Sequence, residues 1–368
     1  MSAFCTLLFL CYNKFGDCML IAVDKDSLKA VKSNNNYVYL FDNESLEDLL
    51  NLNMHCMYYK DLEFADINLT NYDIDCFKKA SINDEDYDKL PEKINYKIGI
   101  IIPNYNYEHT IEKCLTSVFN QTYKNWEIIF VDDMSTDNSV QLASKLYGNY
   151  LDEQNYNDDF GEMKIIKLKQ KRLNGGARNE AYLHLSEDVD YVWYVDSDDW
   201  LYDETALEKI NNKLQKKPDV LFVGMAQFKN GSTTTSYIPN YKNKYEAIRG
   251  WSGSCGKVIK KSLATRQECL YNEGTLKEDK NQHCRICIYM KSFAILKDMV
   301  YVWNRENLKS VTTLRDEIGW KTSTIRHYAD TMQLCLTYND EDKEISKYLK
   351  ERLKQCEDEI KTGGDRQW

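Results

Sequence analysis

The chain has 368 residues, 43% of them hydrophobic, and a formal net charge of −10. This apolar content supports a folded core and excludes a largely disordered chain, while the acidity disfavours broad, sequence-independent binding to nucleic acid or anionic lipid. Twelve cysteines without paired spacing predict reduced, mostly buried thiols in a cytoplasmic protein. No apolar run approaches the ~20 residues of a membrane span, and no basic segment precedes "AFCTLLFLCY", so we expect neither a transmembrane segment nor a signal peptide.

Residues 1–93 are predicted to form a small acidic α/β module. Residues 1–95 hold 17 acidic residues against nine lysines and no arginine. Ser45 is a plausible cap for the helix-like stretch "SLEDLLNLN", and three segments are typical of strands: "TLLFLCY", "CMLIAV" and "YVYLF". The polar stretch 81–95 indicates a linker. The pattern assigns no function to this module.

From residue 96, strand-like and helix-like segments alternate with short loops. The strand-like segments are "YKIGIIIP", "NWEIIFVDD", "EMKIIKLKQ" and "DYVWYVDSDD". This alternation predicts a mostly parallel, doubly wound α/β sheet. Ligands of such sheets bind beyond the carboxyl ends of the strands, so we expect the polar clusters "NYN", "VDDMS" and "DSDD" to meet in one cleft. Four aromatic residues on these strands are expected in the core: Trp126, Phe130, Tyr191 and Trp193.

The pattern loosens after Trp200. A further strand is indicated by "PDVLFVGMAQF", loop-then-helix units by "SGSCGKVIKKSLA" and "LKEDKNQHCRICIYMKS", and a strand running into a polar loop by "DMVYVWNRENLKSVTT". The last segment reads as helices with Glu/Lys pairs near i,i+4 spacing. We therefore expect a main domain at residues 96–316 and a C-terminal helical extension at residues 317–368.

Asp196, Asp198 and Asp199 directly follow an apolar strand. Carboxylates placed so closely repel one another, and Mg²⁺ or Mn²⁺ typically takes one or two carboxylates together with substrate phosphates. The motif therefore predicts a metal that holds a diphosphate, with a solvated turn or a helix cap as the alternative. Asp132 and Asp133 end another strand in the same manner, and would either accept hydrogen bonds from a nucleotide or cap the next helix.

The segment "NGGARN", residues 174–179, places two glycines at the start of a predicted helix. Glycine allows the backbone to approach a ligand closely. Arg178 would then point towards the cleft, where a guanidinium suits a phosphate or a base edge. The segment lacks the spacing of the common phosphate-binding loops, so it is a weak signal by itself.

Taken together, these segments resemble the family 2 glycosyltransferases of the GT-A fold. "IIIPNYNYEHTIEKCLTSVFNQTYKNWEIIFVDDMSTDNS", "NGGARNEA" and "YVDSDDW" follow one another between residue 97 and about residue 205. The resemblance implies a donor-binding set made of Pro103, Tyr105, Asp132, Asp133, Gly176, Arg178, Asp196, Ser197 and Asp198. It also implies that Asp196 and Asp198, with Asp199 adjacent, hold Mn²⁺ or Mg²⁺.

An inverting transferase also needs a base. The acceptor hydroxyl attacks the anomeric carbon as the nucleotide diphosphate leaves, so a carboxylate must take the proton. In the family this group comes from an "ED" at a helix start, which makes Asp279 the expected base with Glu278 beside it; an ordinary acidic helix N-terminus is the alternative. The preceding segment with Lys257 resembles the family's acceptor side, and Trp251 is a candidate platform for a sugar ring.

The late segment "YVWNRENLKSVTT" resembles a mobile family element that closes over the diphosphate, with Arg305, Lys309 or Ser310 in that role. The family sometimes supplies a metal-binding histidine near this point. No histidine lies between residues 284 and 326, so the third protein ligand of the metal stays open. His283, four residues after Asp279, is interpreted as a structural histidine.

We therefore expect a metal-dependent inverting glycosyltransferase that uses a nucleotide-diphosphate sugar, foremost a UDP-sugar, and an acceptor hydroxyl, foremost of a glycan. The alternatives are a transferase acting on a modified nucleobase, a nucleotidyltransferase, and a non-catalytic sugar-nucleotide-binding protein. A nucleotidyltransferase usually has a basic glycine-rich loop after its first strand, which "IIIPNYNYEH" lacks. Both acidic motifs, Arg178 and the "ED" pair argue against a decayed site.

Overall fold

The computed structural model describes residues 94–153, 161–307, 317–338 and 342–362, together with five short strands within residues 1–93. The chain divides into two units, Met1–Ile94 and Asn95–Trp368, which are described separately. The strands of the first unit are β1 Leu7–Tyr12, β2 Cys18–Val23, β3 Val31–Lys32, β4 Tyr37–Val38 and β5 His55–Met57.

In the first unit, β2, β1 and β5 form an antiparallel sheet in that order, and β3 pairs with β4. The strands predicted at "TLLFLCY" and "CMLIAV" are confirmed as β1 and β2, and the segment "YVYLF" contributes β4. The helix predicted at "SLEDLLNLN" lies outside the described residues.

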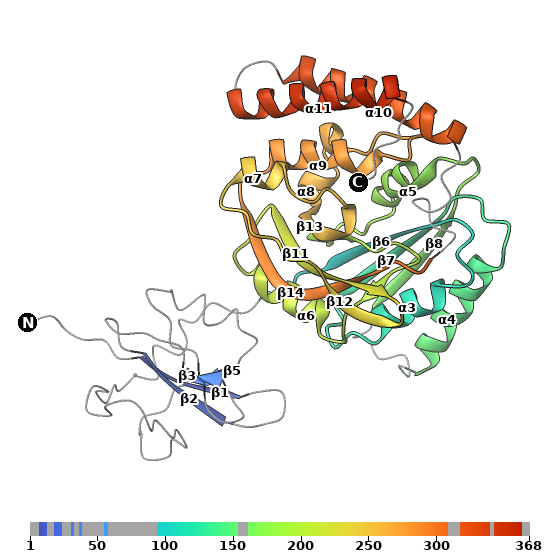
Figure 1. Cartoon of the computed structure of the whole chain (residues 1–368). Coiled ribbons are helices and arrows are strands. Elements are labelled where there is room, and N and C mark those ends of the chain that lie inside the picture. The colour runs from blue at the N-terminus through green and yellow to red at the C-terminus, as the bar shows by residue number, and fades with distance from the viewer. Residues whose placement is uncertain are drawn as a thin grey trace, which may run out of the picture. The chain divides into compact units, whose positions relative to one another are not determined.

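The second unit is built on a nine-stranded sheet with helices on both faces (Figure 1). Its strands are β6 Ile98–Asn104, β7 Trp126–Asp132, β8 Glu162–Lys167, β9 Tyr191–Tyr194, β10 Trp200–Leu201, β11 Val220–Lys229, β12 Ser232–Tyr237, β13 Lys257–Lys260 and β14 Phe293–Asn304. Its helices are α3 Ile111–Phe119, α4 Ser139–Glu153, α5 Leu173–Tyr182, α6 Ala206–Leu214, α7 Lys244–Ile248, α8 Lys261–Ala264, α9 Glu278–Tyr289, α10 Glu317–Thr337 and α11 Lys343–Thr362.

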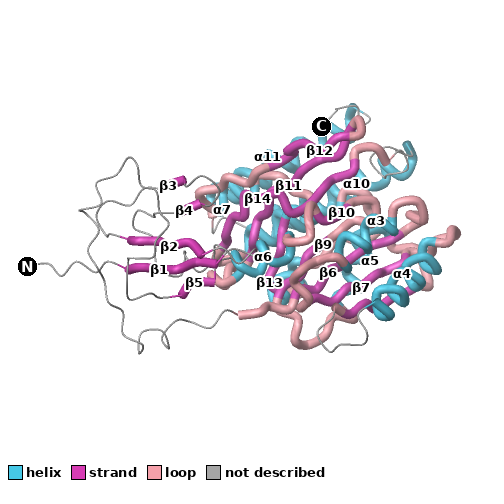
Figure 2. Tube along the Cα trace, turned by 90° about the horizontal axis from the view of Figure 1, so that it is seen from below, coloured by secondary structure: helices cyan, strands magenta, loops and turns pink. Residues whose placement is uncertain are grey.

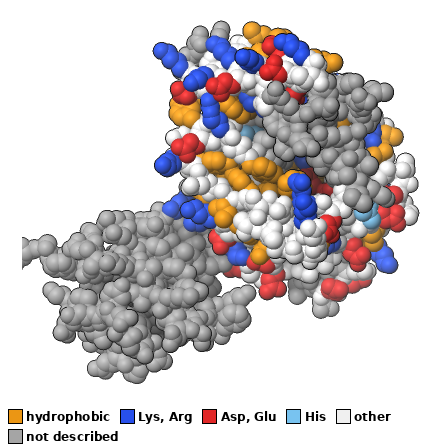
Figure 3. Space-filling view, in the orientation of Figure 1, with side chains coloured by type: hydrophobic (Ala, Val, Ile, Leu, Met, Phe, Trp, Pro, Cys, Tyr) orange, Lys and Arg blue, Asp and Glu red, His pale blue; other side chains and the backbone are white. Residues whose placement is uncertain are grey.

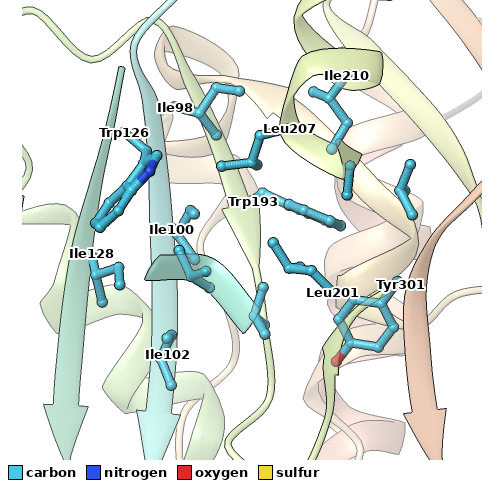
Figure 4. Close-up of a cluster of buried hydrophobic side chains, with 14 of the residues drawn as sticks. Ile98, Ile100, Ile102, Trp126, Ile128, Trp193, Leu201, Leu207, Ile210 and Tyr301 are labelled. Atoms are coloured by element: carbon cyan, nitrogen blue, oxygen red, sulfur yellow. The ribbon is translucent and has the colours of Figure 1, made fainter. Parts of the chain in front are cut away.

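The strands β9, β6, β7 and β8 form the parallel half of this sheet, as the alternating pattern predicts. Every residue of β6 and β7 is buried, because a parallel strand covered by helices on both faces has no polar side. Alternate residues of β6 face different cores: Ile100 packs in the cluster with α3, α4 and α6, whereas Ile101 packs with α5. Figure 4 shows Trp193 and Trp126 within the first cluster, and all four aromatic residues expected in the core are buried.

The other half of the sheet, where β11 and β14 lie side by side in Figure 2, contains both parallel and antiparallel pairs. β11 runs parallel to β14, but β13 is antiparallel to both of its neighbours, β9 and β11, and β10 is antiparallel to β14. The sheet is therefore less uniformly parallel than the sequence pattern predicts.

The helices α10 and α11 pack beside α9 as an antiparallel pair (Figure 1). Among the described residues, no helix combines the length and the apolar character that a bilayer crossing requires. Seven cysteines lie in the described part of the second unit, and all are free thiols: Cys114, Cys255, Cys269, Cys284, Cys287, Cys335 and Cys356.

Candidate active site

The carboxyl ends of β6, β7 and β9 carry the three polar clusters, and hydrogen bonds join them. The Asn104 amide Nδ2 donates to Asp132 Oδ1 at 2.9 Å. The Ser197 hydroxyl, from the loop after β9, donates to the carbonyl oxygen of Pro103 at 2.6 Å. Segments that are about 30 and 90 residues apart in the chain thus meet at one edge of the sheet, where ligands of such folds bind.

Asp132 and Asp133 are both buried and both engaged by the protein. Asp132 Oδ2 accepts a hydrogen bond from the backbone N–H of Ser135 at 3.1 Å. Asp133 accepts the backbone N–H groups of Arg172 and Leu173 at 2.6 and 2.8 Å. Burial raises the pKa of Asp133 in spite of these two bonds. Asp133 therefore holds the turn into α5, while Asp132 shapes the loop after β7.

The glycines of "NGGARN" lie in the first turn of α5, but protein groups occupy the space beside them. A Cβ on Gly175 would come within 2.8 Å of the carbonyl oxygen of Asn272, and one on Gly176 within 2.3 Å of the Arg172 Cβ. The absent side chain of Gly175 lets α5 pack directly against the segment that leads into α9, whereas that of Gly176 leaves room for Arg172 just before the helix. This close approach brings Arg178 towards Glu278.

Arg178 links the two acidic motifs of the site. Its Nη2 donates to Asp196 Oδ1 and its Nη1 to Glu278 Oε1, each at 2.7 Å. The guanidinium side chain is only 3% exposed, so these are buried, charge-assisted bonds. Although burial disfavours its charge, the neighbouring carboxylates hold the pKa of Arg178 well above its usual value. Its Nε, also buried, has no hydrogen-bond partner among the described groups.

The three aspartates after β9 differ sharply in their surroundings. Asp196 is one-third exposed and paired with Arg178. Asp198 is partly buried, and burial together with the charge of Asp196 raises its pKa to about 6. Asp199 is buried, and its two oxygens accept hydrogen bonds from the Tyr301 hydroxyl at 2.6 Å and the Asn304 N–H at 2.8 Å. Asp199 thus fastens β14 to this loop.

The donor set fits a hard divalent cation. Ligand atoms of Asp196, Asp199 and Cys255 lie within 4.8 Å of one another. Cys255 is buried, and this burial raises the pKa of its thiol well above its usual value. Two of these three groups are carboxylates, which are the ligands that Mg²⁺ and Mn²⁺ prefer; Asp198, two residues after Asp196, does not belong to this cluster.

A cavity of about 410 Å³ opens beside Asp198. We call it the Asp198 cavity; its lining residues are His109, Thr110, Lys113, Asp198, Trp200, Phe228, Asn304, Glu306 and Asn307. The amide Nδ2 of the buried Asn307 donates to Asp198 Oδ2 at 2.7 Å, and His109 Nε2 lies 3.2 Å from Asn307 Oδ1. His109, Asn307 and Asp198 therefore form a hydrogen-bonded chain along one wall.

Glu278 and Asp279 form the first turn of α9, as the sequence predicts. Burial raises the pKa of Glu278 to about 7, against the opposing effect of Arg178. Asp279 is half-buried, and among the described residues its carboxylate makes no hydrogen bond or ion pair. It is thus the carboxylate of the pair that remains available to an incoming group.

The C-terminal helices hold the start of α9 in place. Lys277 Nζ, just before α9, pairs with Glu359 of α11 at 2.7 Å in a buried ion pair. Asn281 Nδ2 donates to Asp330 Oδ2 of α10 at 2.8 Å. Both contacts lie within two residues of Asp279, so the helical extension helps to set the position of this carboxylate.

Lys257 and Trp251 support a loop near the site. The Lys257 ammonium is fully buried and donates to the carbonyl oxygens of Ser252 and Gly253 at 2.8 and 2.7 Å. Burial lowers its pKa to about 8. The half-buried Trp251 ring packs against Tyr237, with ring centroids 5.7 Å apart. Lys257 therefore holds the backbone that follows Trp251 rather than facing solvent itself.

The remaining expected site residues lie at the rim. Tyr105 is 38% exposed, with Lys171 Nζ 3.0 Å above its ring. Arg305 is exposed and stacks over Trp303. Lys309 and Ser310 lie outside the described residues. His283 is buried with Nε2 3.0 Å from the Ala247 carbonyl oxygen, which agrees with its interpretation as a structural histidine.

Three residues around the aspartates escaped the sequence interpretation: His109, Tyr301 and Asn307. Tyr301 and Asn307 lie in the late segment "YVWNRENLKSVTT", whose pattern gives no sign that a tyrosine hydroxyl or an asparagine amide pairs with the acids. His109 precedes α3, 89 residues away from Asp198 in the chain, and no local pattern relates the two. Only the register of the strands brings them together.

Comparison with known proteins identifies the family. The family model described as "Glycosyl transferase family 2" matches residues 99–283. The glycosyltransferase GlyA of Streptococcus pneumoniae is 37% identical over 123 residues, which make up 32% of this chain and 15% of GlyA. The Escherichia coli enzyme WfgD, a UDP-Glc:α-D-GlcNAc-diphosphoundecaprenol β-1,3-glucosyltransferase, is 29% identical over 157 residues, 42% of this chain and 55% of WfgD. The chain thus spans little more than half of WfgD and far less of GlyA.

Solved structures share the fold. A crystal structure of S. aureus TarS in complex with UDP-GlcNAc has a TM-score of 0.55 at 19% identity, and the match covers 71% of each chain. The mannosyltransferase PcManGT of Pyrobaculum calidifontis, in complex with GDP-Man and Mn²⁺, has a TM-score of 0.50 at 15% identity, covering 73% of this chain and 72% of PcManGT. The likeness supports the GT-A fold. Since the family model covers half of its length, the chain belongs to glycosyl transferase family 2.

Proposed function

We propose that this family 2 glycosyltransferase is metal-dependent and inverting, and that it moves a sugar from a nucleotide-diphosphate donor to an acceptor hydroxyl. The observation that carries the proposal is the double hydrogen bond of Arg178 to Asp196 and Glu278. This contact brings the acids after β9 and the "ED" of α9, which are 82 residues apart, to opposite ends of a single guanidinium. A transferase needs these two groups within one substrate's reach.

The donor side is proposed at the ends of β6, β7 and β9. Tyr105 is 38% exposed, and we propose that the base stacks on the face of its ring that Lys171 leaves uncovered. Pro103 and the buried Asp132 lie at the ends of the paired strands β6 and β7. We propose that Asp196 and Asp198 hold Mn²⁺ or Mg²⁺, with Asn307 in contact with Asp198. A bound divalent cation would neutralise charge on the leaving diphosphate. The PcManGT complex with GDP-Man and Mn²⁺ supports this assignment by likeness of fold.

Asp279 is the proposed base. It is half-buried at the start of α9 and unpaired within the described residues, whereas Glu278 is committed to Arg178. The acceptor hydroxyl would lose its proton to Asp279 as it attacks the anomeric carbon, and the nucleotide diphosphate would leave on the opposite side. Inversion follows from this single displacement. Arg178 fixes Glu278, and with it the first turn of the helix that carries the base.

A UDP-sugar is the proposed donor and a glycan the proposed acceptor. The TarS complex with UDP-GlcNAc and the activity for which WfgD is named, transfer from UDP-Glc, support the donor. The acceptor named for WfgD is a sugar carried on a diphosphate-linked lipid. The proposed catalytic domain comprises residues 96–316, with residues 317–368 as a helical extension that braces α9.

Donor hydrolysis tests the proposal. The full chain is incubated with UDP-Glc, UDP-GlcNAc or GDP-Man, with Mn²⁺ or with EDTA, and release of the nucleoside diphosphate is measured. We expect release that requires the metal and that is lost in Asp198→Asn. Asp152→Asn, at an exposed position on α4, is the matched control and should behave as the unmodified protein. Release that ignores both EDTA and the Asp198 substitution would refute the metal-dependent assignment.

A further inference from the structure

The outer side of α10 carries an apolar row. Ile325, Met332 and Leu336 are 58%, 42% and 64% exposed, and Ala329 between them is exposed as well. Their spacing of four, three and four residues places them on one face of a helix. The buried residues of α10, among them His327, lie on the opposite face. This row therefore points away from the core.

The neighbouring helix α11 carries a row of lysines with the same spacing. Lys343, Lys347, Lys350 and Lys354 are all exposed and line one surface hollow together with Ser346 and Glu351. The apolar residues that anchor α11, Ile345, Leu349 and Cys356, are 1% exposed and face inward. A step of 100° per residue puts Lys347 on the far side of the helix from Leu349.

The two rows lie on adjacent helices that rest on the same support. The Tyr328 hydroxyl of α10 donates to Glu357 of α11 at 3.3 Å, and Arg352 lies 2.9 Å from His327 Nε2. Asp330 of α10 contacts Asn281 of α9, and Glu359 of α11 contacts Lys277 just before α9. Figure 3 shows basic, acidic and hydrophobic side chains next to one another along the top of the molecule, over the helices labelled α10 and α11 in Figure 1. We call this surface the α10–α11 face.

The α10–α11 face carries mostly positive charge, whereas the whole chain is negatively charged. The exposed charged positions of α11 are Lys343, Glu344, Lys347, Lys350, Glu351, Lys354 and Lys361. Glu351 in addition pairs with Arg249 at 3.4 Å, so its charge is partly offset. In a chain whose net charge is −10, a lysine row beside exposed aliphatic side chains is a local exception. The overall acidity disfavours broad anionic binding, but it does not act against such a confined patch.

We propose that the α10–α11 face docks on an anionic phospholipid surface. Exposed aliphatic side chains enter the headgroup region while neighbouring lysines pair with lipid phosphates, which is the chemistry of interfacial helices. A second copy of the chain fits less well, because two such faces would set lysines against lysines. Nucleic acid would engage the lysines but leave the apolar row without a partner. Docking of this kind goes beyond the transfer reaction and depends on neither the metal nor the base.

Sedimentation with vesicles tests the proposal. The full chain is mixed with vesicles of neutral phosphatidylcholine, or of phosphatidylcholine with about 30% phosphatidylglycerol, at low and high salt. Three double variants are compared: Lys347→Glu with Lys354→Glu, Ile325→Glu with Leu336→Glu, and the control Lys145→Glu with Lys216→Glu at exposed lysines on and after other helices. We expect binding to anionic vesicles that salt weakens and that each face variant reduces about tenfold, with the control unchanged.

Several results would overturn the proposal. These are no sedimentation with anionic vesicles, equal sedimentation of the face variants and the control, or a dimer in light scattering that only the apolar variant converts to monomer. Binding to DNA without binding to vesicles would instead assign the lysine row to a polyanion. Circular dichroism and donor hydrolysis check that each variant is folded. If the apolar variant fails to fold, the lysine variant decides the outcome because it removes no buried contact.

Discussion

The two sides of the aspartate cluster after β9 are built differently. On the side of α5 and α9, Arg178 is buried and already bonded to Asp196 and Glu278. On the side of α3 and β14, Asp198 borders a cavity and is held by the neutral amide of Asn307. The first side is held together by buried charge pairs, whereas the second offers groups that can exchange partners. The wall formed by α5 and α9 thus holds the buried charge pairs, and the wall formed by α3 and β14 borders the cavity.

This division has a physical reason. Breaking a buried charge pair leaves an uncompensated charge and costs several kcal/mol, so the Arg178 wall resists rearrangement. A hydrogen bond from a neutral amide to a carboxylate contributes about 1.5–3 kcal/mol, and a bond to a ligand can replace it at a smaller cost than breaking a buried ion pair. We therefore expect the α5–α9 wall to govern geometry and catalysis, and the α3–β14 wall to govern ligand and metal affinity.

The largest expected effect is on catalysis, at the rigid wall. Replacing Asp279 by Asn removes the proposed base, and we expect the turnover of sugar transfer to fall about 10²- to 10⁴-fold. Nucleotide binding, measured by thermal shift, should change little, because Asp279 is not part of the donor-binding set. Asp279→Glu is the matched variant and should recover part of the activity. Full activity in Asp279→Asn would show that a group other than Asp279 acts as the base.

The second prediction concerns stability at the same wall. Arg178→Met leaves the buried Glu278 without its cation, and we expect the free energy of unfolding in urea to fall by about 3–5 kcal/mol. Arg172→Met is the control, since Arg172 forms its ion pairs with Glu180 and Glu273 nearer the surface. Exposed pairs contribute about 0–1 kcal/mol. Equal losses in the two variants would contradict the distinction between the walls.

The third prediction addresses the open wall. Asn307→Ala removes the hydrogen bond to Asp198, and we expect the affinity for Mn²⁺ to fall about 10- to 100-fold, as is typical of groups that orient a metal ligand. The urea stability should change far less than in Arg178→Met. Asn125→Ala, at an exposed position remote in sequence, serves as control. An Asn307 variant with unchanged Mn²⁺ titration would remove Asn307 from the metal environment.

The smallest expected effect concerns the pH dependence of stability, which tests whether His283 of α9 is buried in its neutral form. Burial, with a contribution from Lys257, lowers the pKa of His283 well below its usual 6.5. As pH falls below about 6.5, His283 binds a proton in the unfolded chain but not in the folded chain. The free energy of unfolding therefore decreases on acidification. Relative to His283→Gln, the unmodified protein should lose up to about 1.4 kcal/mol of stability per pH unit. Parallel stability curves would mean that His283 is protonated in the fold.

Much of the donor side can be predicted from the sequence, because the residues of each motif lie within a few positions of one another. The apolar run of β6, the acids after β9 and the "ED" at the start of α9 each lie within a few residues. Strand ends in a parallel sheet converge, so their meeting follows from the alternating pattern. The antiparallel insertion of β13 does not follow, because a four-residue strand carries too little pattern to show its direction.

The hydrogen-bond partners inside the site cannot be predicted from the sequence in the same way. That Arg178 bonds to Asp196 and Glu278 rather than facing a phosphate depends on how closely α5 approaches the segment before α9. That approach depends on the space above Gly175, which is a tertiary property. His109 and Asn307 depend in the same way on segments about 200 residues apart. Such contacts cannot be read from spacing along the chain.

The buried pair between Lys277 and Glu359 has a consequence for the order of events during synthesis. The helix that carries the proposed base is complete once Tyr289 is made, but one of its anchors arrives 70 residues later. A nascent chain on the ribosome would therefore contain the proposed donor side, at the ends of β6, β7 and β9, before the helix that carries Asp279 is fixed in position. Competence for transfer would then arise only as the last long helix emerges and closes against its neighbour.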